Sequence, residues 1–500
     1  NFMCAGAEAL AYMELREIEP ELAAYSLKCA KEDWNFAYTN REMPDFCKFD
    51  DPNRICTPLL KSSAACWSAV DLYKATEEVY YRDMAICFAD EIIACQQQEI
   101  TDWDTPYVGF FYDDASHKLI AHCSHRSHDN EPIQSLARLA ACMPDHENFG
   151  KWMYAVNLYS DYIQNASEAT APYYVVPASI YHEDEAMHDN EYDMGMIKKY
   201  LTDDERRENY RLQVQNGVPL GNGYYLRREP VAFEHRGNHD VTLAGGKGVA
   251  AAAAKNDYAL AELAQRQFEW ISGKNPFAES VMFGEGYDYC QEYAVLPGEM
   301  VGELGVGFAT LDEHDSPFWP QVNTCVYKEV WIRSVLQWIW LASDLHGGAK
   351  ISGIMPQKNG KVLFTNMDYG CIYELSVNSE TGWYEGELPA GNYEICCCGQ
   401  IKHMTLLASR SYRLDAPFYD YQIKARKEGN EVTLVIRTQG SGRARIKLNM
   451  INLTCCDFDR EIILGEEIEI KGEIREARRP YYAVLIPDGK LEQIKEVYGR

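Results

Sequence analysis

The chain has 500 residues, of which 46% are hydrophobic and 25% charged, the composition of an ordinary globular protein with two or three domains. Its formal net charge of −28 opposes binding to phosphate backbones and to anionic membranes, so we expect neither a nucleic-acid nor a membrane partner. The longest apolar run, Val335 to Leu345, is interrupted by Gln337 and Ser343 and is shorter than the roughly 20 residues of a spanning helix.

Cysteine usage points to a reducing compartment. The 17 cysteines include the adjacent runs 396–398 and 455–456, which suit disulfide geometry poorly. No charged and apolar leader follows Asn1, so we expect a cytoplasmic location. Zinc sites usually need Cys-x-x-Cys pairs, which do not occur, and we expect neither a metal nor a cofactor.

The first two thirds of the chain repeat a helical pattern, with apolar positions three and four residues apart. The predicted helices are 4–17, 20–39, 61–76, 78–97, 131–143, 147–166, 202–214, 240–254, 257–272 and 323–345. Short connections join several of them into αα-hairpins, the units from which toroids and helical solenoids are built. The long segments 98–130, 167–200, 215–238 and 274–321 are rich in aromatic residues, Gly, Pro, His and Asp, so we expect the chemistry there.

After Gly347-Gly348 the pattern changes to short alternating segments separated by Asn-Gly, Gly-Asn and Pro-Asp-Gly turns. The predicted strands are 361–364, 371–377, 393–397, 421–425, 432–437, 444–448, 467–470 and 482–486. We place a domain boundary near 347–352, between a helical domain over 1–348 and a β-rich domain over 349–500. A β-sandwich or two small β-modules should make up the second domain.

Three blocks carry a resemblance to a known family. Residues 271–289, Ile-Ser-Gly-Lys-Asn-Pro-Phe-Ala-Glu-Ser-Val-Met-Phe-Gly-Glu-Gly-Tyr-Asp-Tyr, follow a predicted helix and run from a Gly-x-Asn-Pro turn into a Gly-x-Gly stretch. Residues 236–250 lead from an Arg-Gly-Asn-His turn into an Ala-rich helix, and Tyr327-Lys-Glu-Val-Trp-Ile332 comes near the end of the helical part. In this order, the blocks resemble glycoside hydrolase family 9, which implies a mainly α fold: an α/α toroid of helical hairpins followed by a β-sandwich-like domain.

The resemblance implies hydrolysis of a β-glycosidic bond with inversion, in which two carboxyl groups hold a water between them. Glu329 is the expected general acid, because the block places it there and because Tyr327 and Trp331 flank it on an otherwise apolar predicted helix. An ordinary ion pair with Arg333, four residues later, is the alternative.

The chain departs from the family in two places. No Asp-x-Gly-Asp turn, which would supply the family's catalytic base, occurs in the sequence, and the family's His-His-Arg motif is replaced by residues 290–303. We therefore expect an N-terminally incomplete catalytic domain, or a base from Asp102, Asp104, Asp113 or Asp114. The missing His-His-Arg motif favours short or modified oligosaccharides over long cellulose chains.

Further candidate substrate contacts lie in the long loops. His122, His125, Arg126, His128 and Asp129 precede a predicted helix and could contact sugar, bind a metal or form a capped polar loop. Tyr173 to Tyr181 could stack on sugars or pack in the interior, and Asp184, Glu185 and Asp189 could hold Ca²⁺ or form a solvated acidic loop. The other predicted sugar contacts are Arg236, His239, Tyr287, Trp319 and Tyr327.

Three functions remain open from the sequence. The first is a glycosidase acting on β-linked oligo- or polysaccharides such as β-glucans. The second is an α/α-toroid polysaccharide lyase, suggested by the His125-Arg126-His128 loop. The third is a carbohydrate-binding protein without activity, suggested by the missing Asp turn.

Overall fold

The computed structural model describes residues 1–41, 57–122, 130–188, 201–231, 238–253, 257–291, 300–310, 314–318, 328–356, 360–408, 410–418, 420–488 and 494–500. The chain forms two compact units. The first comprises Asn1–Met143, Ala155–Ala252 and Leu263–Trp338, and the second Pro144–Tyr154, Ala253–Glu262 and Ile339–Arg500. The domain boundary near 347–352 stays a prediction.

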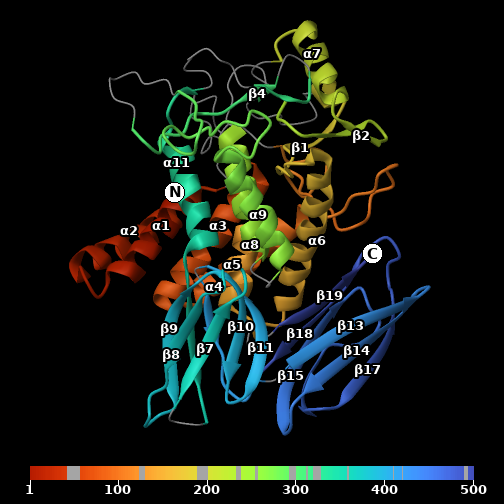
Figure 1. The fold of residues 1–500 in the computed structure, drawn as a ribbon. Coiled ribbons are helices and arrows are strands. Elements are labelled where there is room, and N and C mark those ends of the chain that lie inside the picture. The colour runs from red at the N-terminus through yellow and green to blue at the C-terminus, as the bar shows by residue number, and fades with distance from the viewer. Residues whose placement is uncertain are drawn as a thin grey trace. The chain divides into compact units, whose positions relative to one another are not determined.

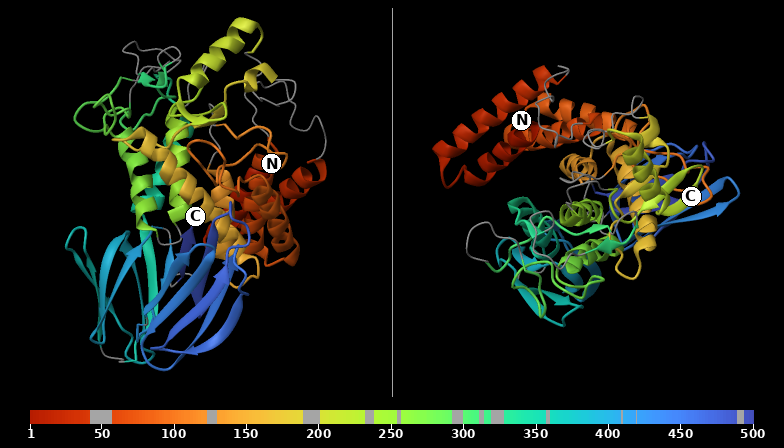
Figure 2. Two further views of the ribbon diagram at one scale, coloured as in Figure 1. Left: turned by 90° about the vertical axis from the view of Figure 1, so that its right-hand side faces the viewer. Right: turned by 90° about the horizontal axis from the view of Figure 1, so that it is seen from above.

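Helical hairpins build the first unit, as the periodicity predicts. The helices are α1 (Phe2–Leu15), α2 (Pro20–Asn40), α3 (Pro58–Thr76), α4 (Val79–Ala94), α5 (Glu131–Cys142), α6 (Phe149–Ser167), α7 (Asp204–Gln215), α8 (Asn238–Ala253), α9 (Tyr258–Ile271) and α11 (Ile332–His346). Helices α6, α8, α9 and α11 have residues in both units. The antiparallel pairs α1 with α2 and α3 with α4 lie side by side (Figures 1 and 2).

Capping residues explain where several helices begin and end. Thr57 precedes Pro58 and its hydroxyl accepts the Leu60 N–H, so α3 begins there. Asp203 caps α7 in the same way by accepting the Arg206 N–H. Glu77, in the left-handed conformation with φ 59°, ends α3 and lets the chain turn back into α4.

Two of the long segments predicted to be irregular, 167–200 and 215–238, contribute strands. β1 (Ser179–His182), β3 (Tyr224–Arg227) and β2 (Val218–Gly221) make an antiparallel sheet in the order β1–β3–β2. Their short length hides the alternation of buried and exposed residues that would reveal a strand in the sequence. This sheet carries one end of the buried polar network described below.

A close approach of two backbones fixes the segment after α4 against α6. Gln96 donates from Nε2 to the carbonyls of Gly109 and Ala155 over 3.1 and 2.9 Å. Gly109 has φ +98°, and a Cβ there would lie 1.9 Å from the carbonyl oxygen of Leu158. Only glycine fits this position, because a side chain would collide with the backbone of α6.

The second unit contains two β-sandwiches in sequence. The first has the sheets β11–β10–β7–β8 and β12–β6–β9, and the second the sheets β13–β14–β17 and β16–β15–β18–β19 (Figure 1). The strands are β6 (Gly348–Ile354), β7 (Lys361–Asn366), β8 (Ile372–Ser376), β9 (Trp383–Pro389), β10 (Gly391–Cys397), β11 (Gln400–Leu406), β12 (Ser411–Arg413), β13 (Asp420–Glu428), β14 (Glu431–Gln439), β15 (Arg443–Ile451), β16 (Phe458–Ile463), β17 (Glu467–Glu473), β18 (Tyr481–Pro487) and β19 (Lys495–Gly499).

Each sandwich has its own apolar core. In the first, Ile351, Phe364 and Tyr393 belong to one cluster of buried side chains. In the second, Leu434 and Leu448 belong to another. The alternation of buried and exposed residues along these strands is the pattern expected when one face of a sheet packs on a core.

Candidate functional site

Glu329 lies in extended backbone that pairs with residues 304–306. Its carbonyl accepts the Val306 N–H over 2.9 Å, and Trp331 N–H donates to the Leu304 carbonyl over 3.2 Å. Helix α11 begins only at Ile332, so the prediction that residues 329–331 are helical is wrong. Val330 and Trp331 are residue types that favour strands, and backbone pairing with 304–306 outweighs helix propensity here.

The side chain of Glu329 is half-buried and oriented by its neighbour. The indole Nε1 of Trp331 donates to Oε2 of Glu329 over 2.9 Å. A hydrogen bond to a carboxyl group fixes the direction in which the group points. The arrangement therefore holds one carboxyl group in place at the start of α11.

The block at 271–289 pairs with residues 302–304, next to the segment that pairs with Glu329. Asn275 ends the turn after α9 by donating to the carbonyls of Trp270 and Glu279 over 2.8 and 2.9 Å. Further along, Phe283 N–H donates to the Glu303 carbonyl, and Met282 pairs with Leu304. Segments 280–283, 302–306 and 329–331 thus lie side by side and bring two of the blocks together.

His239 contacts the middle one of these three segments. Its side chain is fully buried, and Nδ1 bonds to the Gly305 carbonyl over 2.9 Å. Burial lowers the pKa of His239 to about 4, so the ring is neutral at ordinary pH. The placement differs from the expected direct sugar contact, because a fully buried imidazole offers no surface to a sugar.

Tyr287 is fully exposed on the block at 271–289, and its part in substrate binding stays a prediction. The remaining predicted contacts, His125, Arg126, His128, Arg236, Trp319 and Tyr327, lie outside the described residues, as do Asp129 and Asp189.

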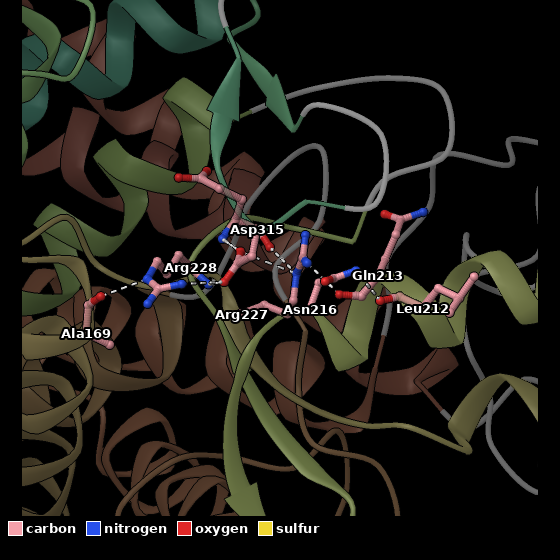
Figure 3. Close-up of polar contacts among 8 residues, drawn as sticks. Ala169, Leu212, Gln213, Asn216, Arg227, Arg228 and Asp315 are labelled. Carbon is pink, nitrogen blue, oxygen red and sulfur yellow. Dashed lines mark hydrogen bonds and ion pairs between the residues drawn. The ribbon is translucent and has the colours of Figure 1, made fainter.

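A buried ionic network anchors residues 314–318 to the end of β3 (Figure 3). The carboxylate of Asp315 accepts the backbone N–H groups of Arg228 and Glu229 over 3.0 and 2.9 Å, and the fully buried Arg227 guanidinium lies 3.5 Å away. Burial, and then the charge of Asp315, raise the pKa of Glu229 well above its usual value. The protonated form of Glu229 is therefore favoured beside Asp315.

His122 packs against an aromatic side chain, and the rest of the His122–Asp129 segment, with its alternatives of a sugar contact, a metal site or a capped polar loop, lies outside the described residues. The His122 ring stacks on Tyr181 with ring centres 4.1 Å apart, and Tyr181 is buried, so this part of the Tyr173–Tyr181 segment packs in the interior. Glu185 is also buried: His182 N–H donates to its Oε2 over 3.0 Å and the Tyr210 hydroxyl contacts Oε1.

The prediction of a solvated or Ca²⁺-binding acidic loop is therefore wrong for Glu185. Burial raises the pKa of its carboxyl group to about 8, so the group stays protonated at neutral pH and is a poor cation ligand. Among the described residues, no cluster of three His, Cys, Asp or Glu side chains is placed to hold a metal ion.

Comparison with known proteins identifies the family. The sequence model of glycosyl hydrolase family 9 matches residues 2–294, more than half of the chain. The chain belongs to glycosyl hydrolase family 9. No curated protein matches it significantly.

Solved structures of family 9 proteins are also similar to this chain. The cellulase Cel9M of C. cellulolyticum has 18% identity over 67% of this chain and 60% of its own, with a TM-score of 0.38. The catalytic domain of Clostridium thermocellum CelT has 16% identity over 67% of this chain and 58% of its own, with a TM-score of 0.35. The Bacteroides ovatus GH9 protein has 14% identity over 68% of this chain and 51% of its own, with a TM-score of 0.40. The chain spans less than two thirds of the length of each of these structures.

Family membership confirms the predicted fold class, helical hairpins of the α/α-toroid type followed by β-rich structure. Within the described residues, no helix is both long and apolar enough to cross a membrane. Every cysteine in that part of the chain is a free thiol.

The four aspartates suggested as substitutes for the family's base differ in exposure. Asp102 and Asp104 are exposed, whereas Asp113 and Asp114 are half-buried. Two hydrogen bonds fix the backbone of Asp113: its carbonyl accepts the Leu59 N–H, and its own N–H donates to the Leu119 carbonyl. The role of a base for any of them stays a prediction.

Proposed function

We propose that this family 9 chain hydrolyses β-linked oligo- or polysaccharides of the β-glucan type with inversion, and that Glu329 is the general acid. The observation that carries the proposal is the position of the Glu329 carboxyl group, held by the Trp331 indole and by backbone pairing beside the family block at 280–283. An acid that protonates a leaving oxygen needs a fixed position, which this arrangement supplies.

The reaction also needs a carboxylate base that activates water on the opposite face of the sugar. Asp113 is our candidate within the described residues, because it is half-buried and lines a cavity. We further propose that the protein works in a reducing compartment such as the cytoplasm, a proposal supported by the free thiols of the described residues.

The test is release of reducing ends from β-linked gluco-, glucosamino- and xylo-oligosaccharides. We expect turnover by the unaltered chain, a loss of at least about 100-fold in kcat for Glu329→Gln, and little change for Glu285→Gln, an exposed residue of the neighbouring block. Turnover that survives Glu329→Gln would remove Glu329 from the acid role.

A carbohydrate-binding function without turnover is the second candidate, favoured by the missing Asp-x-Gly-Asp turn. It predicts that oligosaccharides raise the unfolding temperature of the chain while no substrate in the panel is cleaved. Thermal unfolding in the presence of each oligosaccharide separates it from the first proposal.

A further inference from the structure

Three adjacent cysteines, 396–398, lie where strand β10 turns back into β11. Cys397 pairs with Gln400 of β11, and Cys398 and Gly399 form the turn between them. Both turn residues have positive φ, 51° for Cys398 and 76° for Gly399. Two successive left-handed residues make a type I′ hairpin turn, in which Asn, Asp and Gly are the usual residue types. The turn alone therefore does not explain a cysteine at 398.

The left-handed conformation of Cys398 brings its thiol to that of Cys397. The two Sγ atoms lie 3.8 Å apart. Cys396 also neighbours Cys397, but successive side chains of an extended strand point to opposite faces of the sheet, so these two thiols point apart. Cys397 and Cys398 therefore form a vicinal dithiol, a pair of neighbouring thiols whose sulfur atoms are in contact.

The two thiols of this pair differ in access. Cys398 is exposed, whereas Cys397 is 1% exposed and belongs to the apolar core of the first β-sandwich. Burial, and then the neighbouring Cys398 thiol, raise the pKa of the Cys397 thiol, so Cys397 stays protonated at ordinary pH. A reagent that arrives from solvent consequently meets Cys398 first.

A second adjacent pair in the chain is built differently. Cys455 is half-buried and Cys456 is exposed, so one thiol is again sheltered and the other accessible. The Sγ atom of Cys455, however, lies 3.2 Å from Sδ of Met450. The two Cys-Cys pairs thus have the same sequence and a similar difference in access, but in the second pair the sheltered sulfur contacts a methionine.

We propose that Cys397 and Cys398 form a site of reversible oxidation by hydrogen peroxide or an organic hydroperoxide, at which Cys398 reacts first and Cys397 then closes a disulfide with it. This activity is separate from the proposed hydrolysis and does not depend on it. It needs no residue of the site around Glu329.

The chemistry takes two steps. In the first, the Cys398 thiolate attacks one oxygen of the peroxide: an S–O bond forms, the O–O bond breaks, and the hydroxide that leaves takes up the proton lost by the thiol. In the second, the Cys397 sulfur attacks the sulfenic acid of Cys398: an S–S bond forms, the S–O bond breaks, and the departing hydroxide takes the Cys397 proton. Two thiols and one hydrogen peroxide give one disulfide and two waters.

The disulfide between Cys397 and Cys398 should be easy to reduce. Neighbouring Cα atoms across a trans peptide are about 3.8 Å apart, whereas disulfides usually join Cα atoms about 4.4–6.8 Å apart. A disulfide under such strain is more oxidising than a structural one. Reduced glutathione should therefore return the site to two thiols once the peroxide is gone, as a reducing compartment requires.

The test treats the folded chain with excess hydrogen peroxide, alkylates the remaining thiols and maps the peptides by mass spectrometry. We expect Cys397 and Cys398 to be joined in a disulfide, with a disulfide fraction at least about tenfold larger than at Cys455 and Cys456, because only the first pair holds its sulfur atoms together. Reduced glutathione added afterwards should restore both thiols.

Three variants locate the bond. Cys398→Gly removes the reacting thiol but suits the positive φ, so this variant should fold and should keep Cys397 as a thiol. Cys397→Ser should leave Cys398 as a sulfenic acid that dimedone traps. Cys396→Ser is the matched control and should form the disulfide as the unaltered chain does. If Cys397→Ser fails to fold, Cys398→Gly and Cys396→Ser still decide.

Equal disulfide fractions at the two Cys-Cys pairs, or no disulfide at either, would overturn the site. So would a disulfide between Cys396 and Cys397 that survives in Cys398→Gly. Oxidation of Cys398 to sulfinic acid while Cys397 stays a thiol would also overturn it, because the second step would then not occur.

Discussion

The indole Nε1 of Trp331 donates to Oε2 of Glu329 over 2.9 Å, from a residue only two positions away in extended backbone. Trp331→Phe removes this donor but keeps an aromatic ring. If Glu329 is the acid, the variant should lose about 10- to 100-fold in kcat with KM nearly unchanged, because the carboxyl group is misplaced for proton transfer. Steady-state kinetics check this, with Trp338→Phe as the control. A change confined to KM would contradict it.

Substitutions of Asp315 and Glu229 should have non-additive effects on the free energy of unfolding. Glu229→Gln alone should change stability little, because the protonated carboxyl group is replaced by another neutral group. Asp315→Asn should cost about 2 kcal/mol, since it removes the anion beside buried Arg227, and Glu229 can then ionise in its place.

The double variant Asp315→Asn, Glu229→Gln leaves Arg227 without either anion. It should be less stable than the sum of the single effects by at least about 1 kcal/mol. Urea unfolding of the four chains measures this coupling. Additive effects would show that Glu229 does not compensate for Asp315.

Glu185 should make the protein less stable as the pH rises above neutrality. Its carboxyl group has a pKa of about 8 when folded and near 4.5 when unfolded, so the folded chain holds an extra proton between these values and stability falls as pH rises through them. His122 acts oppositely between about 3 and 6.5, because the unfolded chain binds the extra proton there. The effects of Glu185 and His122 offset each other between about 4.5 and 6.5, where His239 acts in the same direction as His122. Above that range Glu185 and Glu229, whose pKa is also raised, both lower the stability as the pH rises.

Between pH 6.5 and 8, Glu185 should lower the unfolding free energy of the unaltered chain by roughly 2 kcal/mol. Glu185→Gln should not show this decrease. The measurement is urea unfolding of the unaltered chain and the variant at four pH values in this range, with Asp184→Asn as the control. Parallel curves for the unaltered chain and Glu185→Gln would contradict a protonated Glu185.

Gly109→Ala should destabilise the first unit severely. The new Cβ would collide with the Leu158 carbonyl, so one backbone must move, and we expect a loss of about 3 kcal/mol or more in unfolding free energy. Gly429→Ala also places alanine at positive φ, but in open space, and should cost only about 1 kcal/mol. Equal losses in the two variants would show that conformation alone, and not the contact with α6, requires Gly109.

The helices were predictable because their signals are local. Pro20, Pro58 and Asp203 mark helix starts, and the intervals between apolar residues match the buried faces. The strands of the first β-sandwich were partly missed: β6 and β9 contain glycines that interrupt the alternation, although they pair with each other along their full length.

The site was less predictable because its contacts join distant parts of the sequence. The family block indicated Glu329, but its extended backbone depends on pairing with residues 304–306. Glu185 looked like part of a solvated acidic loop, and only its burial against Tyr210 reverses that interpretation. A charged residue type gives no sign of its final environment when a residue that buries it, here Tyr210, lies 25 positions away.

The separate cores of the two β-sandwiches have a consequence for calorimetry. Because no buried residue among those that the structure describes belongs to both clusters, one core can melt while the other remains folded. A heating scan should therefore show overlapping transitions, and the van't Hoff enthalpy should be smaller than the calorimetric enthalpy. A single melting temperature would then be an average over parts of the chain that melt separately. Each stability measurement above therefore needs a probe in the unit that carries the substitution.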